Sequence, residues 1–305
     1  AILSIYKKDS VFLIARSKSF VIKPDLCIGN NTSIAFQMAG DSLYHPSLMF
    51  KYFADKKLVQ LVRADEGMSK SPFIDTYHKI EMGVEVIEWK TDEPRMELKM
   101  TRTLSGDYKT FFQSLNLFDL LTWDLLAYND EVHPCHAVQK FSDKMMSREF
   151  YADDFAADYG YSLAQVLQLL LNLSYINLIH YDSETRLVTC NDRLFEYIES
   201  RGRKRDYDVI KINSHVNKME NAKMNLLNFD LKIFGVRQIQ LSDSQNVTVF
   251  PYPNEILMKK NRYFEFDGRI RAGRFQYYGK NHSFDYDAFK INLTNCDSLH
   301  ILAQA

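Results

Sequence analysis

The hydrophobic pattern of this chain of 305 residues changes its period twice. Residues 1–103 and 206–305 carry short runs in which apolar and polar side chains alternate, as they do in half-buried strands. Between these segments the apolar residues recur at the spacing of a helix, and they are Phe111, Phe112, Leu115, Phe118, Leu121, Leu125, Ala137, Val138, Phe141 and Met145. The pattern predicts an α+β chain, mainly β, in which two β domains flank a central helical module.

The composition agrees with a β-rich globular protein. The chain has 18 Tyr and 21 Phe but only 11 Gly and 7 Pro, and aromatic side chains fit the pleated surface of a sheet. A chain of this length fits two or three domains. We therefore expect a β domain over residues 1–107, a helical module over 108–205 and a C-terminal β domain over 206–305.

The N-terminal segment contains strands about ten residues apart without helices between them. The expected strands are Val11–Ala15, Phe20–Ile22, Ser33–Met38, Leu48–Phe53, Leu58–Val62, Val84–Trp89 and Met96–Met100. Turn residues such as Gly29-Asn30-Asn31 separate them. This spacing indicates a sandwich, a barrel or a solenoid.

The central module has the outline of a winged helix. After two short helical stretches, Ser162 is placed to cap a long apolar helix that reaches about Leu178. Runs at Ile179–Tyr181 and Leu187–Cys190 then predict a hairpin. The long helix is interrupted by polar residues and is shorter than the ~20 apolar residues that cross a bilayer, so we expect a buried helix and no transmembrane segment.

The most regular β stretch is Phe264–Gly279, where Gly268, Gly273 and Gly279 stand five and six residues apart. Glycine adopts a positive φ readily, so the pattern predicts short strands that turn at these glycines, with Ile270 facing the core between two arginines. A solenoid would have this pattern, and so would a meander around a sandwich. Both interpretations of the C-terminal domain stay open.

The charge pattern argues against binding to duplex DNA. The net charge is −1, and there is no Lys or Arg between Glu149 and Thr185, where a winged helix places its recognition helix. Phosphate contacts dominate the affinity for DNA. The basic segment 201–205 could touch phosphates through Arg203 and Arg205, so nucleic-acid binding is only a second alternative.

No metal or cofactor site is expected. His133, Cys135 and His136 place three potential ligands within four residues, but no second pair of ligands lies near in sequence, as zinc requires. Pro134 between them instead indicates the first turn of a helix. The four cysteines are widely separated and indicate buried thiols; they are Cys27, Cys135, Cys190 and Cys296.

Catalysis is not the favoured interpretation. The segment Asp75–Glu81 mixes acids with His78, the residue types of acid–base chemistry, but no nucleophile motif accompanies it. A solvated, hydrogen-bonded loop between strands explains the segment more simply. Whether the chain is an enzyme stays uncertain, with no catalytic residue assigned and a non-enzyme preferred.

A group of aromatic and acidic residues near the C-terminus supplies the candidate binding residues. Tyr277 and Tyr278 could stack on a sugar or a partner surface, although aromatic ladders across strands explain them more simply. Asp285 and Asp287, expected on one strand face, could with Asp267 act as paired carboxylates or Ca²⁺ ligands. These residues support an alternative function, a β protein that binds or degrades polysaccharide.

Three stretches resemble segments of very large, uncharacterised multidomain proteins of Bacteroidota. They are Leu61–Gly67 running on through Pro72 to His78, Gly235–Ser244, and Phe264–Ile291. The resemblance implies an envelope-associated or exported protein and no catalytic residue. The start at Ala1 without Met and the apolar run Leu299–Ala303 also indicate a segment of a longer chain.

These observations lead to one preferred function. We expect a non-catalytic structural or protein-interaction segment of a larger envelope-associated protein. The expected partners are neighbouring domains of the same long chain or other envelope proteins, and the expected location is the cell envelope or outside the cell.

Overall fold

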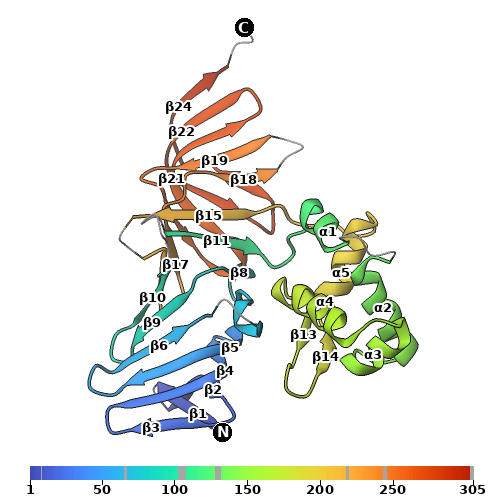
Figure 1. Ribbon diagram of the computed structural model, residues 1–305. Helices are drawn as coiled ribbons and strands as arrows, with labels where there is room; N and C mark the ends of the chain where they lie inside the picture. The colour runs from blue at the N-terminus through green and yellow to red at the C-terminus, as the bar shows by residue number, and fades with distance from the viewer. Residues whose placement is uncertain are drawn as a thin grey trace. The chain divides into compact units, whose positions relative to one another are not determined.

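The computed structural model describes residues 1–7, 9–64, 67–101, 108–127, 132–217, 220–242 and 246–302. Half of the chain is in strands and a fifth is in helices, which confirms that the protein is mainly β. Two compact units are formed (Figure 1). The sheet unit comprises Ala1–Ala64, Phe73–Leu115 and Val209–Ala305, and the helical unit comprises Asp65–Pro72 and Asn116–Asp208.

The sheet unit is built from antiparallel strands of very different length. Its strands are β1 (Ile2–Lys7), β2 (Ser10–Arg16), β3 (Phe20–Lys23), β4 (Leu26–Met38), β5 (Asp41–Phe53), β6 (Leu58–Val62), β7 (Phe73–Asp75), β8 (Ile80–Met82), β9 (Val86–Lys90), β10 (Arg95–Lys99), β11 (Tyr108–Ser114), β15 (Lys211–Val216), β16 (Ala222–Asn225), β17 (Leu231–Phe234), β18 (Ile239–Ser242), β19 (Val247–Pro251), β20 (Glu255–Met258), β21 (Phe264–Ala272), β22 (Phe275–Asp285), β23 (Lys290–Asn292) and β24 (Asn295–Ile301). A 3₁₀ turn, η2 (Lys260–Arg262), precedes β21.

Two ladders of strand pairs separate at β5 and meet again at β21. The C-terminal half of β5 pairs with β6, and the ladder continues through β9, β10, β16, β17 and β20 to the first half of β21. The other half of β5 pairs with β7, and β8, β11 and β15 follow. A bridge between Ser214 and Val236 then leads to β18, β19 and the second half of β21. The sheet thus forms two layers and is nearly closed around one core.

Both β segments contribute to this one sheet, which differs from the two β domains expected for residues 1–107 and 206–305. Leu98 of β10 lies opposite Ala222 of β16, and Phe112 of β11 lies opposite Ile212 of β15. All four side chains are buried in the same core. An alternating pattern shows which face of a strand is buried but not which strand it pairs with, so the sequence did not reveal the shared sheet.

The glycine-rich stretch follows its expected alternation but has only one of its three expected turns. Ile270 is buried between two partly exposed arginines, and φ is positive at Gly268 (136°) and Gly273 (59°), as predicted. The chain turns at Gly273 between β21 and β22, as predicted, but the turns predicted at the other two glycines are wrong, because β21 runs through Gly268 and β22 runs through Gly279. A Cβ at Gly279 would lie 1.9 Å from the carbonyl oxygen of Asn295. These two glycines therefore permit close backbone approach within strands.

The helical unit has a core of its own. Its elements are η1 (Gly67–Lys70), α1 (Leu120–Ala127), α2 (Pro134–Met145), β12 (Glu149–Tyr151), α3 (Ala152–Tyr159), α4 (Leu163–Tyr175), β13 (Ile179–Tyr181), β14 (Leu187–Cys190) and α5 (Asp192–Arg201). Ser162 caps α4 as predicted, in a reciprocal arrangement with Gln165, and the predicted hairpin of β13 and β14 is present. The strand order in the small sheet is β12-β14-β13.

The helical period predicted from Phe111 onward is wrong for its first residues. Residues 108–114 form β11, in which Phe112 is buried and Phe111 is only partly buried, and the first helix begins at Leu120. A short aromatic run fits the period of a strand and that of a helix equally well. Pairing with β8 and β15 makes this run a strand. Over the described part of the chain, no helix combines the length and apolar character needed to cross a membrane.

Candidate functional site

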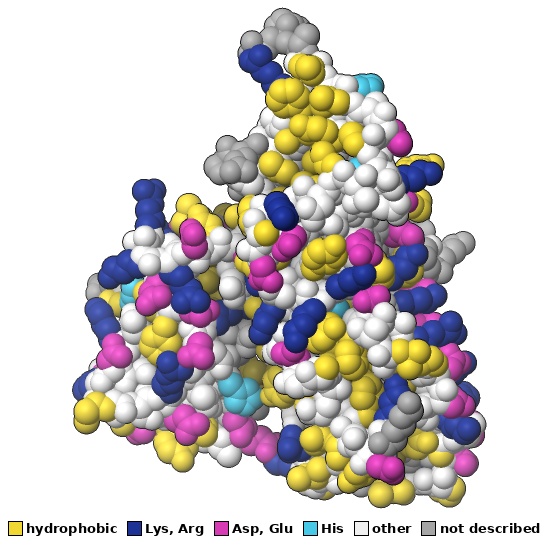
Figure 2. All heavy atoms as spheres, turned by 180° about the vertical axis from the view of Figure 1, so that it is seen from behind, with side chains coloured by type: hydrophobic (Ala, Val, Ile, Leu, Met, Phe, Trp, Pro, Cys, Tyr) yellow, Lys and Arg dark blue, Asp and Glu magenta, His cyan; other side chains and the backbone are white. Residues whose placement is uncertain are grey.

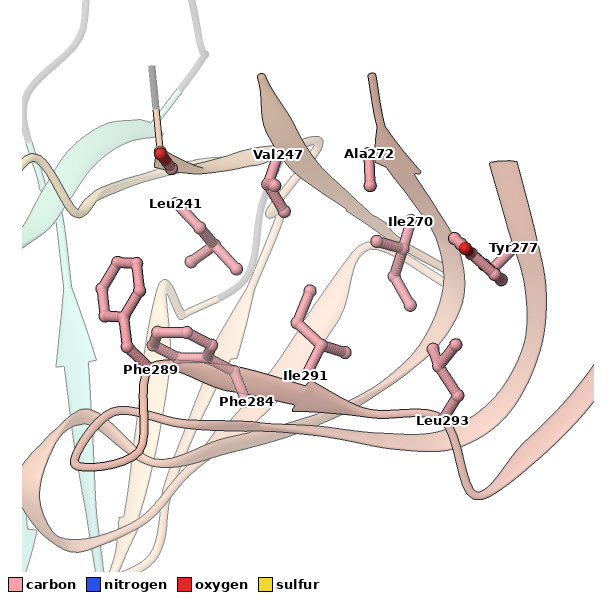
Figure 3. A pocket seen from close by; sticks show the side chains of 10 residues that line it. Leu241, Val247, Ile270, Ala272, Tyr277, Phe284, Phe289, Ile291 and Leu293 are labelled. Carbon is pink, nitrogen blue, oxygen red and sulfur yellow. The ribbon is translucent and has the colours of Figure 1, made fainter. Parts of the chain in front are cut away.

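The core of the sheet unit opens at its C-terminal end. A pocket of about 230 Å³ lies there, and its walls are mainly apolar. Its lining residues are Leu241, Ser242, Val247, Ile270, Ala272, Tyr277, Phe284, Phe289, Ile291 and Leu293. Figure 3 shows Leu241, Val247 and Ile270 on one side and Phe284, Phe289 and Ile291 on the other, with their side chains pointing into a common space. Apolar residues of both layers therefore meet here without filling the gap.

The strands around this pocket are the last in each layer. The first half of β22 pairs with β24, and its last residues pair with β23. Among the described residues, β23 and β24 have no other strand partner. Every residue of β24 is exposed, including Leu299 (51%) and Ile301 (67%). In Figure 2, hydrophobic side chains gather near this end of the sheet unit.

The two candidate tyrosines lie on opposite faces of β22. Tyr277 lines the pocket and lies opposite Leu299 of β24. Tyr278 lies opposite Ser298, its ring centroid is 4.9 Å from that of His300, and its hydroxyl donates to the side-chain oxygen of Gln276. Because neighbouring strand residues face opposite sides, only Tyr277 belongs to the pocket.

The candidate carboxylates hold the turn after β22. Asp285 ends this strand and its Oδ1 accepts a hydrogen bond from the backbone N–H of Ala288 (3.1 Å). Asp287 lies in the following turn and accepts from the side-chain amide of Asn261 (2.6 Å). The expectation that both acids share one strand face is wrong, since aspartate readily accepts from its own turn. Asp267 is not part of this turn: its Oδ1 accepts a hydrogen bond from the backbone N–H of Asn281 (2.7 Å).

A second hollow, of about 490 Å³, lies beside β20, β21 and the turn that carries the exposed Tyr252. It is more polar, but its glutamates are engaged: Glu255 pairs with Lys232 (2.6 Å), and Glu265 pairs with Lys259 (2.7 Å). The hydrogen bond that the Lys259 ammonium donates to Glu265 raises the pKa of Lys259, because the carboxylate stabilises the charged form. These contacts fit a set of surface ion pairs.

Asp75 and His78 form a fully buried pair, although a solvated loop was expected. Asp75 Oδ2 is 2.6 Å from His78 Nδ1, and Asp75 Oδ1 accepts the His78 backbone N–H (2.9 Å). The carbonyl oxygen of His78 in turn accepts the backbone N–H of Arg262 (3.0 Å). The expectation failed because the η2 turn covers this loop, which the local sequence does not show. An Asp three residues before a His was the available signal.

Arg262 extends this buried polar cluster. The residue is buried, one guanidinium nitrogen donates to Ser114 Oγ (2.8 Å), and the guanidinium carbon lies 3.5 Å from the ring centroid of Tyr286. The cluster thus links β11, η2 and the turn after β22. Enclosed polar groups that are joined by hydrogen bonds in this way support a structural role.

The potential metal ligands around position 135 make structural contacts in the helical unit. His133 caps α2: its Nδ1 accepts the N–H of Cys135 (3.2 Å), its Nε2 lies 3.0 Å from the carbonyl oxygen of Trp123, and its ring stacks on Trp123 at 3.7 Å. Burial lowers the pKa of His133 and raises that of the Cys135 thiol to about 12. No group of three or more side chains able to hold a metal occurs among the described residues.

The two candidate arginines follow α5. Arg203 is exposed and has a positive φ of 56°, and Arg205 forms an ion pair with Glu196 (2.7 Å). Both arginines belong to the helical unit, and one of them has an acidic partner. Sequence reasoning missed the pocket itself, because Leu241, Val247 and Leu293 are ordinary apolar residues with no motif.

No protein-family model matches the chain, and neither a curated protein nor a solved structure does.

Proposed function

We propose that this chain is a non-catalytic structural or protein-interaction segment whose C-terminal sheet end binds another polypeptide. One observation supports the proposal most directly: an apolar pocket between the two layers opens beside β24, a strand whose residues are all exposed. Exposed apolar surface of this kind marks interaction sites in soluble proteins. An exposed edge strand next to it adds outward-facing backbone groups.

The setting of this function is a larger envelope-associated or exported protein. The resemblance of Leu61–His78, Gly235–Ser244 and Phe264–Ile291 to segments of giant multidomain proteins supports this setting. The partner would then be a neighbouring domain of the same chain or another envelope protein.

The helical unit fits a winged-helix-like module that makes protein contacts. The order α2, β12, α3, α4, β13, β14 and the sheet order β12-β14-β13 support this topology. Residues 149–185 carry no Lys or Arg and include Asp153, Asp158 and Asp182, which disfavour phosphate contacts. Fluorescence anisotropy with random duplexes tests this. Submicromolar binding with a steep salt dependence would contradict it.

Site-specific photo-cross-linking tests the proposed function. A benzophenone amino acid at position 299 should cross-link to one defined polypeptide in the cells that make the protein. Position 22, where Ile22 is exposed at the other end of the sheet, is the matched control. Mass spectrometry identifies the product. Equal labelling at both positions, or none at 299, would contradict the proposal.

A further inference from the structure

The pairing pattern of the sheet identifies what kind of polypeptide fits its C-terminal end. We propose that the partner presents an extended strand, which pairs antiparallel with β24 and buries alternate apolar side chains in the adjacent pocket. The inference rests on the proposed function and adds the chemistry of the partner. Backbone hydrogen bonds would supply affinity and the pocket would supply side-chain specificity, as in other cases of strand addition.

The backbone of β24 offers alternate groups to such a strand. Leu302 donates its N–H to the carbonyl oxygen of Arg274 (2.9 Å), so this pair is hydrogen-bonded. In an antiparallel ladder such pairs alternate with non-bonded ones, and Gln276 lies opposite His300. The N–H groups of His300 and Ser298 therefore point toward β22. Those of Leu299 and Ile301 point outward, where an added strand would accept them.

The side chains select a strand with apolar residues at every second position. Leu299 and Ile301 lie opposite Tyr277 and Phe275, on the face of the strand that carries the pocket residue Tyr277. A new strand beside β24 would bring its own alternate residues onto the same face. Its apolar side chains would then continue the core that Leu299 and Ile301 begin.

The pairing of β22 with β21 is an example, within the molecule, of the pairing proposed between the partner strand and β24. Ile270 lies opposite Tyr277 and Phe264 lies opposite Phe284, and the rings of Phe264 and Phe284 are 5.2 Å apart. β21 carries Ile270 at the pocket wall, and the next strand completes that wall with Tyr277. Repeating this step once more at β24 would close the pocket.

Amide hydrogen exchange with a model strand tests the inference. The probe is an acetylated, amidated peptide with the sequence Thr-Val-Thr-Leu-Thr-Val-Lys, and its control is the same peptide N-methylated at alternate residues. At millimolar concentration the first should slow exchange at Leu299 and Ile301 at least tenfold, and the control should not. His300, already bonded to β22, should change little.

Three other results of the exchange experiment would contradict the proposal. Absence of slowing with the unmethylated peptide would overturn the strand proposal. Equal effects of both peptides would overturn it too, but would leave a polypeptide-binding surface, which the cross-link at position 299 tests independently. Concentration-dependent protection of Leu299 and Ile301 without peptide would show that a second copy of the chain occupies the edge, and would replace the proposed partner.

A pair of variants separates backbone pairing from side-chain contact. Leu299→Pro removes an outward N–H and the side chain, whereas Leu299→Ala removes the side chain alone. We expect the proline variant to weaken peptide binding at least tenfold more than the alanine variant. Protection of the β22 amides in both variants verifies that the sheet is intact. Equal loss in the two variants would overturn the pairing with β24.

Discussion

The two ends of the sheet unit share one strand plan but differ in how the core ends. At the N-terminal end, the long strand β4 pairs with β3 along one half and with β2 along the other. At the C-terminal end, β22 pairs in the same way with β23 and β24. The N-terminal core is filled: the rings of Phe12 and Phe36 lie 5.0 and 6.0 Å from Trp89, and all three are buried. The C-terminal end holds an open pocket.

This difference shows that side chains, not strand pairing, decide whether an end is closed. Residues of β1 alternate between exposed and partly buried, whereas those of β24 are all exposed. Ile22 is exposed at the N-terminal end as well, but the core near its strand is occupied by Phe20 and Phe50, whose rings are 6.0 Å apart. The C-terminal end also has a pair of rings, Phe284 and Phe289, 5.5 Å apart, but these two rings line the open pocket and do not fill it.

The largest contrast is expected from truncating one aromatic side chain at each end. Trp89→Ala should lower the free energy of unfolding by about 3–5 kcal/mol, because Trp89 is fully packed. Phe289→Ala should cost less than about 1 kcal/mol, since half of this side chain is already exposed. Chemical denaturation measures both. Similar losses would mean that the C-terminal core is as complete as the N-terminal one.

The next contrast uses one glycine at each end. Gly279→Ala should cost about 2–3 kcal/mol, because its Cβ would meet the backbone oxygen of Asn295 at 1.9 Å. Gly29→Ala should cost about 1 kcal/mol less, since its Cβ meets side chains of Phe20 and Thr32, which can move. Urea denaturation gives the free energies, and hydrogen exchange should show β24 opening in the Gly279 variant. A larger cost at Gly29 would contradict this account.

A lower pH should loosen the C-terminal end. His282 is buried, and burial lowers its pKa below the usual 6.5. The negative charges of Asp267 and Asp297 raise the pKa, but by less than burial lowers it. Below about pH 6.5 the unfolded chain therefore binds a proton more readily than the folded one, and stability falls as the pH falls. Amide exchange in β22 should accelerate between pH 7 and 5 after correction for intrinsic rates. His282→Phe should remove this acceleration; its persistence would assign the effect to another group.

The smallest effect is expected from charges on β24. Leu299→Asp and Ile301→Asp should change the free energy of unfolding by less than about 0.5 kcal/mol, because both side chains are exposed. Both should reduce binding of the fluorescent dye ANS to the pocket end. A loss of more than about 1 kcal/mol would show that β24 already belongs to the closed core.

The sequence predicted elements better than their assembly. Alternation identified most strands, and Ser162 marked the start of α4, because these signals are local. Tyr277 was found as a candidate, but its pocket neighbours Leu241, Val247 and Leu293 come from separate segments of the chain and carry no motif. The burial of Asp75 and His78 depends on η2, almost two hundred residues away. Contacts of such long range leave no periodic signal in one sequence.

The position of the helical unit between β11 and β15 has a consequence for the order of folding. These strands are direct neighbours, yet residues 116–208 separate them in the chain. Closing so long a loop costs more conformational entropy than a hairpin, so the sheet should form slowly. Leu117 and Asp208 form a bridge at the base of the inserted unit. If the inserted unit folds first, this bridge replaces a long disordered loop with a short one, and β11 and β15 meet at little further cost.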